Sequence, residues 1–308
     1  MPVTTRPSLP SISFGLALPN YRPGATAEGI AAAAENCDRF GWDSVWTTDH
    51  LLIDRSAAGA DYVQIFEALT SLAWIGAAHP RLRLGTSVLV VPMRNAVILA
   101  KEIATLDALS GGRVTMGVGV GWNLVEFANV GAGEMFTRRG RYLDETIALW
   151  RHLWSGSTEP FEGRFHSFRD YAFGPLPAQG AALPILVGGR AEAALTRAGA
   201  LADGYQASSG SPAQLAERAP VVIAAAAKAG RPAPTLSARV RVSFGEGPTS
   251  GYVVRGTPEL MLAEIDAFTA VGVSQFVVDF VETDPERHAA LFERFHRKVA
   301  SARVGARP

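Results

Sequence analysis

Short apolar runs alternate along the chain with longer stretches in which apolar residues recur at helical spacing. We expect strands at residues 12–18, 43–48, 82–91, 114–120, 184–187, 204–207, 236–244 and 273–280. We expect helices at residues 27–40, 62–78, 94–109, 140–154, 190–201, 212–229, 258–271 and 285–302. Strands that each precede a helix form a parallel sheet, and eight such units in series favour closure. The pattern therefore predicts an α/β fold, a (β/α)8 TIM barrel in a single domain over residues 1–308, with a doubly wound open sheet as the alternative.

Three connections are too long for ordinary turns between strands and helices. Residues 122–137 and 245–257 follow predicted strands. They would therefore form insertions on the C-terminal face of the barrel, where the active sites of this fold lie. Residues 155–183 contain a stretch, 161–168, that is typical of a β-hairpin with glycine at its turn.

Composition excludes several classes of protein. The chain has 29 Lys+Arg against 29 Asp+Glu, so a nucleic-acid or membrane partner is not expected. A single cysteine, Cys37, excludes a disulfide framework and a thiolate zinc site within one chain. No apolar stretch approaches the ~20 residues of a membrane span, and residues 1–10 lack the apolar segment of a signal peptide. We expect a cytoplasmic protein with flexible tails at 1–10 and 303–308.

Two glycine motifs lie at predicted strand ends. The alternating glycines Gly117 to Gly121 differ from the dinucleotide fingerprint, because Trp122 stands where a third glycine would be. They would let a flat ligand approach the backbone, although tight packing at a barrel rim explains them equally well. Gly188-Gly189-Arg190 precedes a predicted helix and could bind an anion through backbone amides and Arg190. A turn that needs glycine is the alternative there.

One pair of polar residues could carry acid–base chemistry. Asp49-His50 ends the second predicted strand, and a histidine beside a carboxylate can relay a proton near neutral pH. A purely structural histidine is the alternative. No HExxH, GxSxG or catalytic-cysteine signature is present, so we expect neither a metal site nor a serine or cysteine nucleophile.

Taken together, these stretches resemble the bacterial luciferase-like monooxygenase superfamily, and in particular its branch of deazaflavin F420-dependent oxidoreductases. The resemblance covers nearly the whole chain, in order and in spacing. It is carried by residues 41–50, 84–88, 101–109, 113–122, 141–154, 161–168, 184–190, 202–204 and 256–279.

The resemblance implies a (β/α)8 barrel with an insertion region and a flavin-type ring at its C-terminal mouth. It places a non-prolyl cis peptide at Ser87-Val88, and it assigns His50 and Asp49 as the catalytic pair, with Asp49 holding His50 in its working tautomer. It implies cofactor contacts from Pro19, Asn20, Asp49, His50, Thr86, Ser87, Val88, Val118, Gly119, Val120, Gly121, Gly188, Gly189 and Arg190.

The resemblance also bears on cofactor, substrate and partners. Coenzyme F420 is the expected cofactor, and FMN with a separate reductase is the alternative. Sugar-phosphate dehydrogenases of this branch carry a glutamate where this chain has Trp122, and the next carboxylate is Glu126. We therefore expect Trp122 and Glu126 to shape a pocket for a small, apolar substrate. A homodimer is expected, and a non-catalytic flavin-binding barrel is a third possibility.

Overall fold

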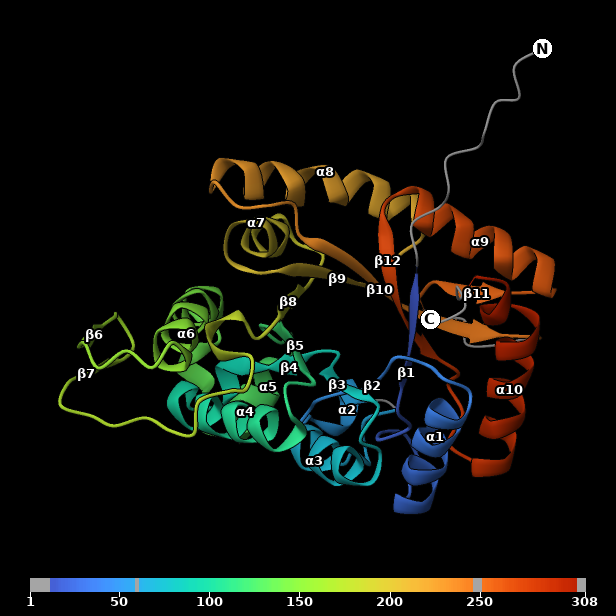
Figure 1. Cartoon of the computed structure of the whole chain (residues 1–308), viewed down its shortest axis with the longest axis horizontal. Coiled ribbons are helices and arrows are strands. Elements are labelled where there is room, and N and C mark those ends of the chain that lie inside the picture. The colour runs from blue at the N-terminus through green and yellow to red at the C-terminus, as the bar shows by residue number, and fades with distance from the viewer. Residues whose placement is uncertain (1–11, 59–60, 246–250, 304–308) are drawn as a thin grey trace, which may run out of the picture.

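Eight parallel strands close into a barrel surrounded by helices in the computed structural model, which describes residues 12–58, 61–245 and 251–303 (Figure 1). The barrel strands are β1 (Ser13–Ala17), β2 (Ser44–Thr47), β3 (Arg83–Thr86), β5 (Val114–Gly119), β8 (Ile185–Gly188), β9 (Gly204–Ser208), β10 (Thr235–Ser243) and β12 (Val273–Asp279). Each strand pairs in parallel with the next, β12 pairs with β1, and β9 pairs with β10. The predicted TIM barrel is confirmed, and the open sheet is excluded.

The outer layer contains the eight predicted helices. They are α1 (Ala27–Arg39), α3 (Ala68–Ala78), α4 (Ala96–Ser110), α6 (Arg139–Trp154), α7 (Glu192–Leu201), α8 (Pro212–Lys228), α9 (Pro258–Ala270) and α10 (Pro285–Lys298). Most begin at a residue whose side chain caps the first turn, such as Asn95 for α4 and Ser211 for α8. Short additions are α2 (Arg55–Ala58), α5 (Leu124–Asn129) and the 3-10 turns η1 (Val91–Met93), η2 (Gly133–Met135), η3 (Gly180–Ala182) and η4 (Ala300–Ala302).

Two predicted elements have different boundaries in the structure. The helix expected at 62–78 begins at Ala68, capped by Glu67, because the preceding residues pair with the segment after β1. The strand expected at 82–91 is interrupted after Thr86, and β4 (Leu89–Val90) pairs separately with β5 before η1. This interruption brings residues 87–90 to the mouth of the barrel.

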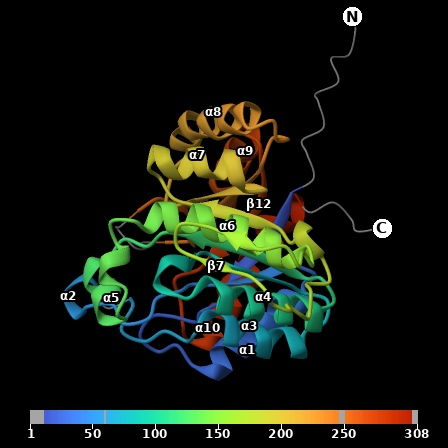
Figure 2. The same cartoon turned by 90° about the vertical axis from the view of Figure 1, so that its left-hand side faces the viewer.

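The long connections contain structure that the hydrophobic pattern did not predict. The first contains α5 and η2, and the third contains β11 (Val253–Arg255), which pairs with β10. The predicted hairpin is confirmed as β6 (Phe161–Glu162) and β7 (Ser167–Phe168), which lies over α6 and α4 (Figure 2). Most residues of the expected tails, 1–10 and 303–308, lie outside the described part, although Arg303 is described and forms an ion pair with Asp266.

An apolar cluster inside the barrel contains one large aromatic side chain. Trp46 lies within the barrel with Ala17, Leu186 and Val277. A Cβ at Gly15 would lie 2.5 Å from its Nε1, and a Cβ at Gly85 would lie 2.3 Å from its Cε3. Glycine is therefore required on both neighbouring strands, and the packed interior confines ligands to the mouth.

Candidate active site

A pocket of about 310 Å³ opens at the C-terminal ends of the barrel strands. This volume is at the small end of the range for ligand pockets. It is lined by Tyr21, Thr48, Asp49, His50, Tyr62, Ser87, Val88, Val90, Gly119, Val120, Gly121, Trp122, Gly188, Gly189, Ser208, Ser209, Arg239, Arg241 and Asp279.

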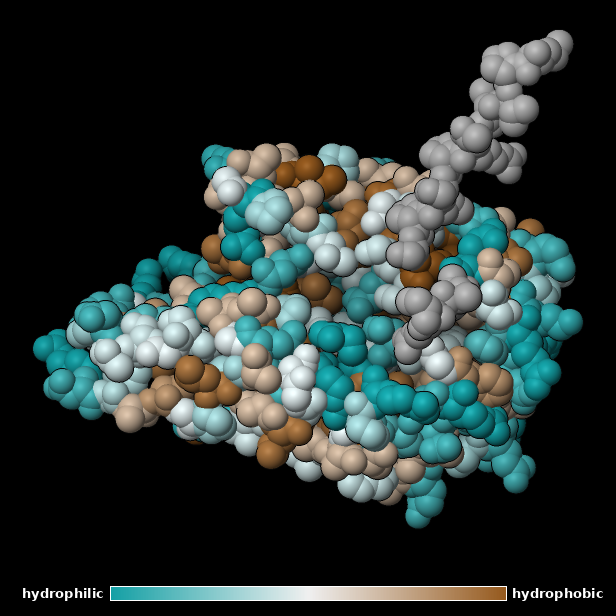
Figure 3. All heavy atoms as spheres, in the orientation of Figure 1, coloured by the Kyte–Doolittle hydropathy of each residue, from teal (hydrophilic) through white to brown (hydrophobic). Residues whose placement is uncertain are grey.

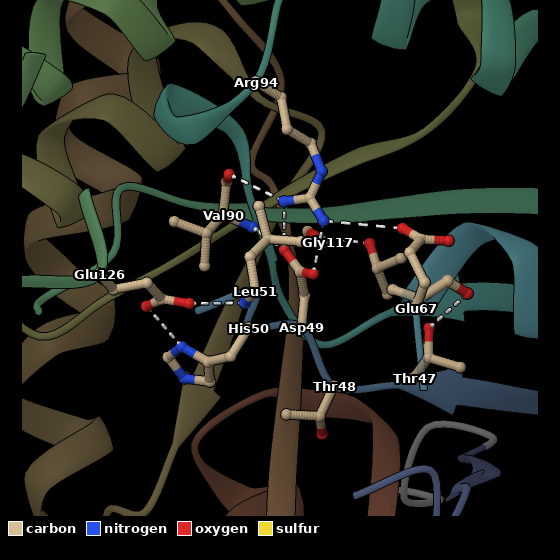
Figure 4. Close-up of polar contacts among 12 residues, drawn as sticks. Thr47, Thr48, Asp49, His50, Leu51, Glu67, Val90, Arg94, Gly117 and Glu126 are labelled. Atoms are coloured by element: carbon tan, nitrogen blue, oxygen red, sulfur yellow. Dashed lines mark hydrogen bonds and ion pairs between the residues drawn. The ribbon is translucent and has the colours of Figure 1, made fainter. Parts of the chain in front are cut away.

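His50 is held by a glutamate from the first long connection (Figure 4). Its Nδ1 lies 2.8 Å from Oε2 of Glu126, and both residues are buried. The other carboxylate oxygen of Glu126 accepts the Leu51 N–H at 2.6 Å. An ionised carboxylate only accepts hydrogen bonds, so Nδ1 carries a proton and Nε2 is the ring nitrogen available to a ligand.

Asp49 does not orient His50, which corrects the expected pairing. Its carboxylate accepts the Val90 N–H at 2.8 Å and two hydrogen bonds from the Arg94 guanidinium, each 2.7 Å long (Figure 4). The physical reason is that successive residues of an extended chain point to opposite sides. Burial raises the pKa of Asp49, while Arg94 favours its ionised form. Asp49 therefore fixes η1 to the end of β2, and Glu126 takes the orienting role.

Glu126 also departs from its expected place. It is 1% exposed and lies behind His50, outside the pocket lining. Asn123 caps α5 by accepting the Glu126 N–H at 2.9 Å, which fixes the start of this short helix. Glu126 is thus a positioning residue for His50, because it does not form part of the substrate wall.

A cluster of four residues, which we call the floor cluster, consists of Tyr21, Arg239 and Asp279, which line the pocket, and of Arg22, which binds Asp279 from outside the lining. Asp279 accepts hydrogen bonds from Arg22 at 3.1 and 3.0 Å, from Arg239 at 2.9 Å and from the Tyr21 hydroxyl at 3.0 Å. Burial acts to raise the pKa of Asp279, but the two guanidinium groups outweigh it and hold this pKa well below its usual range. Burial also raises the pKa of Tyr21, so its hydroxyl remains neutral.

Arg239 connects the floor cluster to the residues that follow β2 and β3. Its Nη1 donates to Thr48 Oγ1 at 2.8 Å and to the Ser87 carbonyl at 2.6 Å. Ser87 precedes Val88 through a non-prolyl cis peptide, as expected. Arg239 therefore fixes the backbone beside Val88 and brings a permanent positive charge to the pocket.

Aromatic rings form one wall of the pocket. The ring of His50 lies edge-on to Trp122 at 5.9 Å and to Tyr62 at 4.6 Å. Tyr62 stacks on Tyr21 at 5.7 Å. Trp122 lines the pocket and is 53% exposed.

Two glycines of the pocket lining let the side chain of Val88 lie against the backbone. A Cβ at Gly119 would lie 2.7 Å from Cγ2 of Val88, and a Cβ at Gly188 would lie 2.9 Å from its Cγ1. Gly119 and Gly188 line the pocket together with Val120, Gly121 and Gly189. These positions therefore need glycine for packing, and they also expose backbone to the pocket.

The predicted anion site is only partly assembled around the pocket. Helix α7 begins after Ala191, which offers no side-chain cap, and Gly188 and Gly189 lie beside the pocket. The first amides of an uncapped helix can bind an anion. Arg190 is exposed and lies outside the pocket lining.

Four expected cofactor contacts lie behind the pocket surface: Pro19, Asn20, Thr86 and Val118. The Asn20 amide binds the Thr48 backbone at 2.9 and 3.0 Å. Thr86 donates to the Gly117 carbonyl at 2.7 Å. These residues shape the strand ends without forming part of the pocket lining.

Sequence reasoning missed nine pocket residues: Tyr21, Thr48, Tyr62, Val90, Ser208, Ser209, Arg239, Arg241 and Asp279. A signal was available for some of them. Arg239 and Arg241 alternate with valines in a buried strand, so period two places both on one face. Asp279 ends the last strand, a position that is typical of functional residues in this fold.

Within residues 12–58, 61–245 and 251–303, no group of three or more His, Cys, Asp or Glu side chains could hold a metal ion. In the same described part, no helix is long and apolar enough to cross a membrane.

Comparison with known proteins shows where this barrel belongs. An F420-dependent glucose-6-phosphate dehydrogenase from Kineococcus radiotolerans is 35% identical over 192 residues, which cover 62% of this chain and 54% of that protein. The chain thus spans about half of the length of this curated relative, and up to about two thirds of others that it matches.

Solved structures share the fold at low sequence identity. The coenzyme F420-dependent tetrahydromethanopterin reductase from Methanopyrus kandleri has a TM-score of 0.77 at 18% identity, covering 95% of this chain and 99% of the other. The oxygenating constituent of 3,6-diketocamphane monooxygenase from Pseudomonas putida, in complex with FMN, has a TM-score of 0.75 at 16% identity, covering 94% and 98%. Residues 12–299 match the family described as luciferase-like monooxygenase. The chain belongs to the luciferase-like monooxygenase family.

Proposed function

We propose that this chain is an oxidoreductase that transfers hydride between coenzyme F420 and a small, apolar organic substrate. The observation that carries the proposal is the buried His50–Glu126 pair, 2.8 Å apart, at the wall of a pocket on the catalytic face of the barrel. The name of the relative from Kineococcus radiotolerans, an F420-dependent dehydrogenase, supports the same cofactor.

The pocket fits a cofactor that consists of a flat ring and a phosphate-bearing chain. Val88, Val90 and Val120 offer an apolar surface to a ring, and the side chain of Val88 needs glycine on both flanking strands to lie there. The uncapped start of α7, beside Gly188 and Gly189, offers backbone amides to a phosphate. F420 would supply or accept the hydride when bound, and the barrel would position it.

His50 would handle the proton that accompanies hydride transfer. When an alcohol carbon loses a hydride, the hydroxyl also loses a proton, and a carbonyl results. Glu126 holds the Nδ1 proton of His50, so Nε2 can take that proton or return it in the reverse direction. A positioned acid–base group of this kind contributes about 10²–10⁴ to the rate.

The walls beside His50 favour an apolar substrate. Trp122 and Tyr62 flank the imidazole with aromatic surface. Such surface suits the carbon skeleton of a small ketone, enone or alcohol better than a sugar. Steady-state assays in which sugar phosphates outperform those compounds would contradict this part of the proposal.

Two alternative functions remain for a barrel with this pocket. A reduced-FMN monooxygenase with a separate reductase is supported by the structural likeness to an FMN-bound monooxygenase. Oxygen consumption coupled to substrate hydroxylation would identify it. A non-catalytic flavin-binding barrel would bind a cofactor tightly without turnover on any substrate of a broad panel.

We also propose a homodimer in the cytoplasm. Trp74 on α3 and Ile98 and Leu109 on α4 are at least 50% exposed, and a groove of about 660 Å³ lies between these helices. On the face that Figure 3 shows, apolar side chains form small patches among hydrophilic ones. Light scattering in solution tests the dimer, and a monomer would contradict it.

A fluorescence titration of the purified protein with F420, and separately with oxidised and reduced FMN, tests the proposed cofactor. We expect saturable binding of F420 and much weaker binding of FMN, because the His50 side of the pocket suits hydride transfer. Preference for reduced FMN would instead favour the monooxygenase.

A further inference from the structure

The floor cluster holds more positive than negative charge. Arg22 and Arg239 carry permanent guanidinium charges. Asp279 forms hydrogen bonds with both of them, and the Tyr21 hydroxyl is neutral. The cluster therefore has a net charge of one positive unit, although Arg239, Tyr21 and Asp279 all line the pocket.

The carboxylates nearest to the pocket have partners of their own. Arg94 binds both oxygens of Asp49, and His50 and Leu51 bind the oxygens of Glu126. Asp61 acts on Arg22 only at longer range, where it favours the charged form. Within the described part of the chain, no further carboxylate forms an ion pair with Arg22 or Arg239.

An uncompensated buried charge is costly unless a partner arrives. The side chain of Arg239 is 10% exposed and that of Arg22 is 7% exposed, so water screens them poorly. Arg239 also reaches the carbonyl of Ser87, next to the Val88 surface that would face a ring. The excess charge is thus directed toward the place where the proposed cofactor ring would lie.

We infer that the floor cluster stabilises the reduced, anionic form of the bound cofactor, so that this form binds more tightly than the oxidised form. The inference rests on the proposed function. A hydride brings two electrons and one proton, so its addition to a ring adds one negative charge unless a second proton follows. A fixed positive charge in the pocket lining would offset that negative charge without any movement of the protein.

The wild-type protein provides the first test. Dissociation constants are measured without oxygen for oxidised and for reduced F420, and the midpoint potential of the bound cofactor is measured by spectroelectrochemistry. We expect the reduced form to bind at least tenfold more tightly, which corresponds to a rise in potential of about 30 mV for a two-electron couple. Equal affinities, or tighter binding of the oxidised form, would overturn the inference.

Variants of Arg239 provide the second test. Arg239→Gln leaves the cluster neutral and should lower the ratio of the two affinities by about tenfold. The midpoint potential of the bound cofactor should then fall by about 30 mV. Arg239→Lys keeps the charge and should retain most of the ratio. Arg303→Gln removes the same charge from an ion pair with Asp266 outside the pocket lining, so it is the matched control and should leave the ratio unchanged.

The outcomes separate the inference from the proposed function. Tight F420 binding without preference for the reduced form contradicts the inference alone. Absence of binding by both F420 and FMN contradicts the proposed function and removes the inference with it. If Arg239→Gln does not fold, the wild-type ratio and its retention in Arg239→Lys still decide the matter.

Discussion

The two sides of the pocket are built from different kinds of charge. On one side, Glu126 binds Nδ1 of His50, which leaves Nε2 of the imidazole available for proton transfer. On the other side, Arg22, Arg239 and Asp279 stay ionised, and their mutual contacts hold the pKa of Asp279 well below its usual range. The His50 side can transfer a proton. The floor cluster instead supplies permanent charges, and its ion pairs connect strands of the barrel.

This difference predicts that the two sides fail in different ways. Loss of the His50 side should remove chemistry while the fold remains, because Glu126 joins only the residues after β2 to one short helix, through its hydrogen bonds with His50 and Leu51. Loss of the fixed side should affect folding, because Asp279 joins β12 to β10 and to the segment after β1.

The largest effect should come from His50→Ala. We expect turnover with the best substrate to fall by about 10²–10⁴-fold, because the group that carries the substrate proton is removed. Cofactor affinity should change little, because the proposed ring and phosphate contacts come from other residues. Steady-state kinetics and the cofactor titration measure both quantities on one preparation. Unchanged turnover would remove His50 from the mechanism.

Glu126→Gln is the matched variant for a positioning role. It keeps the size of the side chain but removes the negative charge that holds the Nδ1 proton of His50. We expect a smaller fall in turnover than for His50→Ala, together with a shifted pH profile. A purely structural Glu126 would leave the pH profile of the residual activity unchanged.

The next effect should come from Asp279→Asn, on stability. The substitution leaves Arg22 and Arg239 buried without a counter-charge, so the free energy of unfolding should fall by about 3–5 kcal/mol. Urea denaturation followed by circular dichroism measures it. Asp266→Asn is the control, because it breaks a more exposed ion pair with Arg303 and should cost only about 0–1 kcal/mol. Equal losses in the two variants would show that the floor cluster does not stabilise the fold.

The contrast between the two sides also separates what the sequence could predict from what it could not. Eight strand–helix units and the position of His50 follow from local pattern, because the period of two or 3.6 is visible in a single stretch. The partner of His50 could not be predicted from local pattern, because Asp49 is the nearest carboxylate in sequence whereas Glu126 lies 76 residues away. Helix α5, which carries Glu126, has only six residues, too few for a helical period to be recognised in the sequence.

The floor cluster was missed for a related reason. Arg22 lies 257 residues from Asp279, so their contact depends on barrel closure between the first and last strands. Closure itself was predicted, but the side chains that meet across it depend on strand register, which a single sequence does not specify. The local clues were the alternation of Arg239 and Arg241 with valines and the position of Asp279 at the end of a predicted strand.

The smallest effect should be the pH dependence that His288 contributes beside the floor cluster. His288 is 3% exposed and lies edge-on to Phe280 at 5.5 Å. Burial lowers the pKa of His288 from 6.5 to about 4. As pH falls below 6.5, the unfolded chain takes up a proton that the folded chain takes up only near pH 4. Stability should therefore decrease across that window, by at most about 3 kcal/mol, and His288 should contribute no further loss below it.

Denaturation of the wild type and His288→Gln at several pH values isolates this contribution, because the surrounding carboxylates are common to both. A flatter profile in the variant is expected, and identical profiles would show that His288 protonates equally in both states.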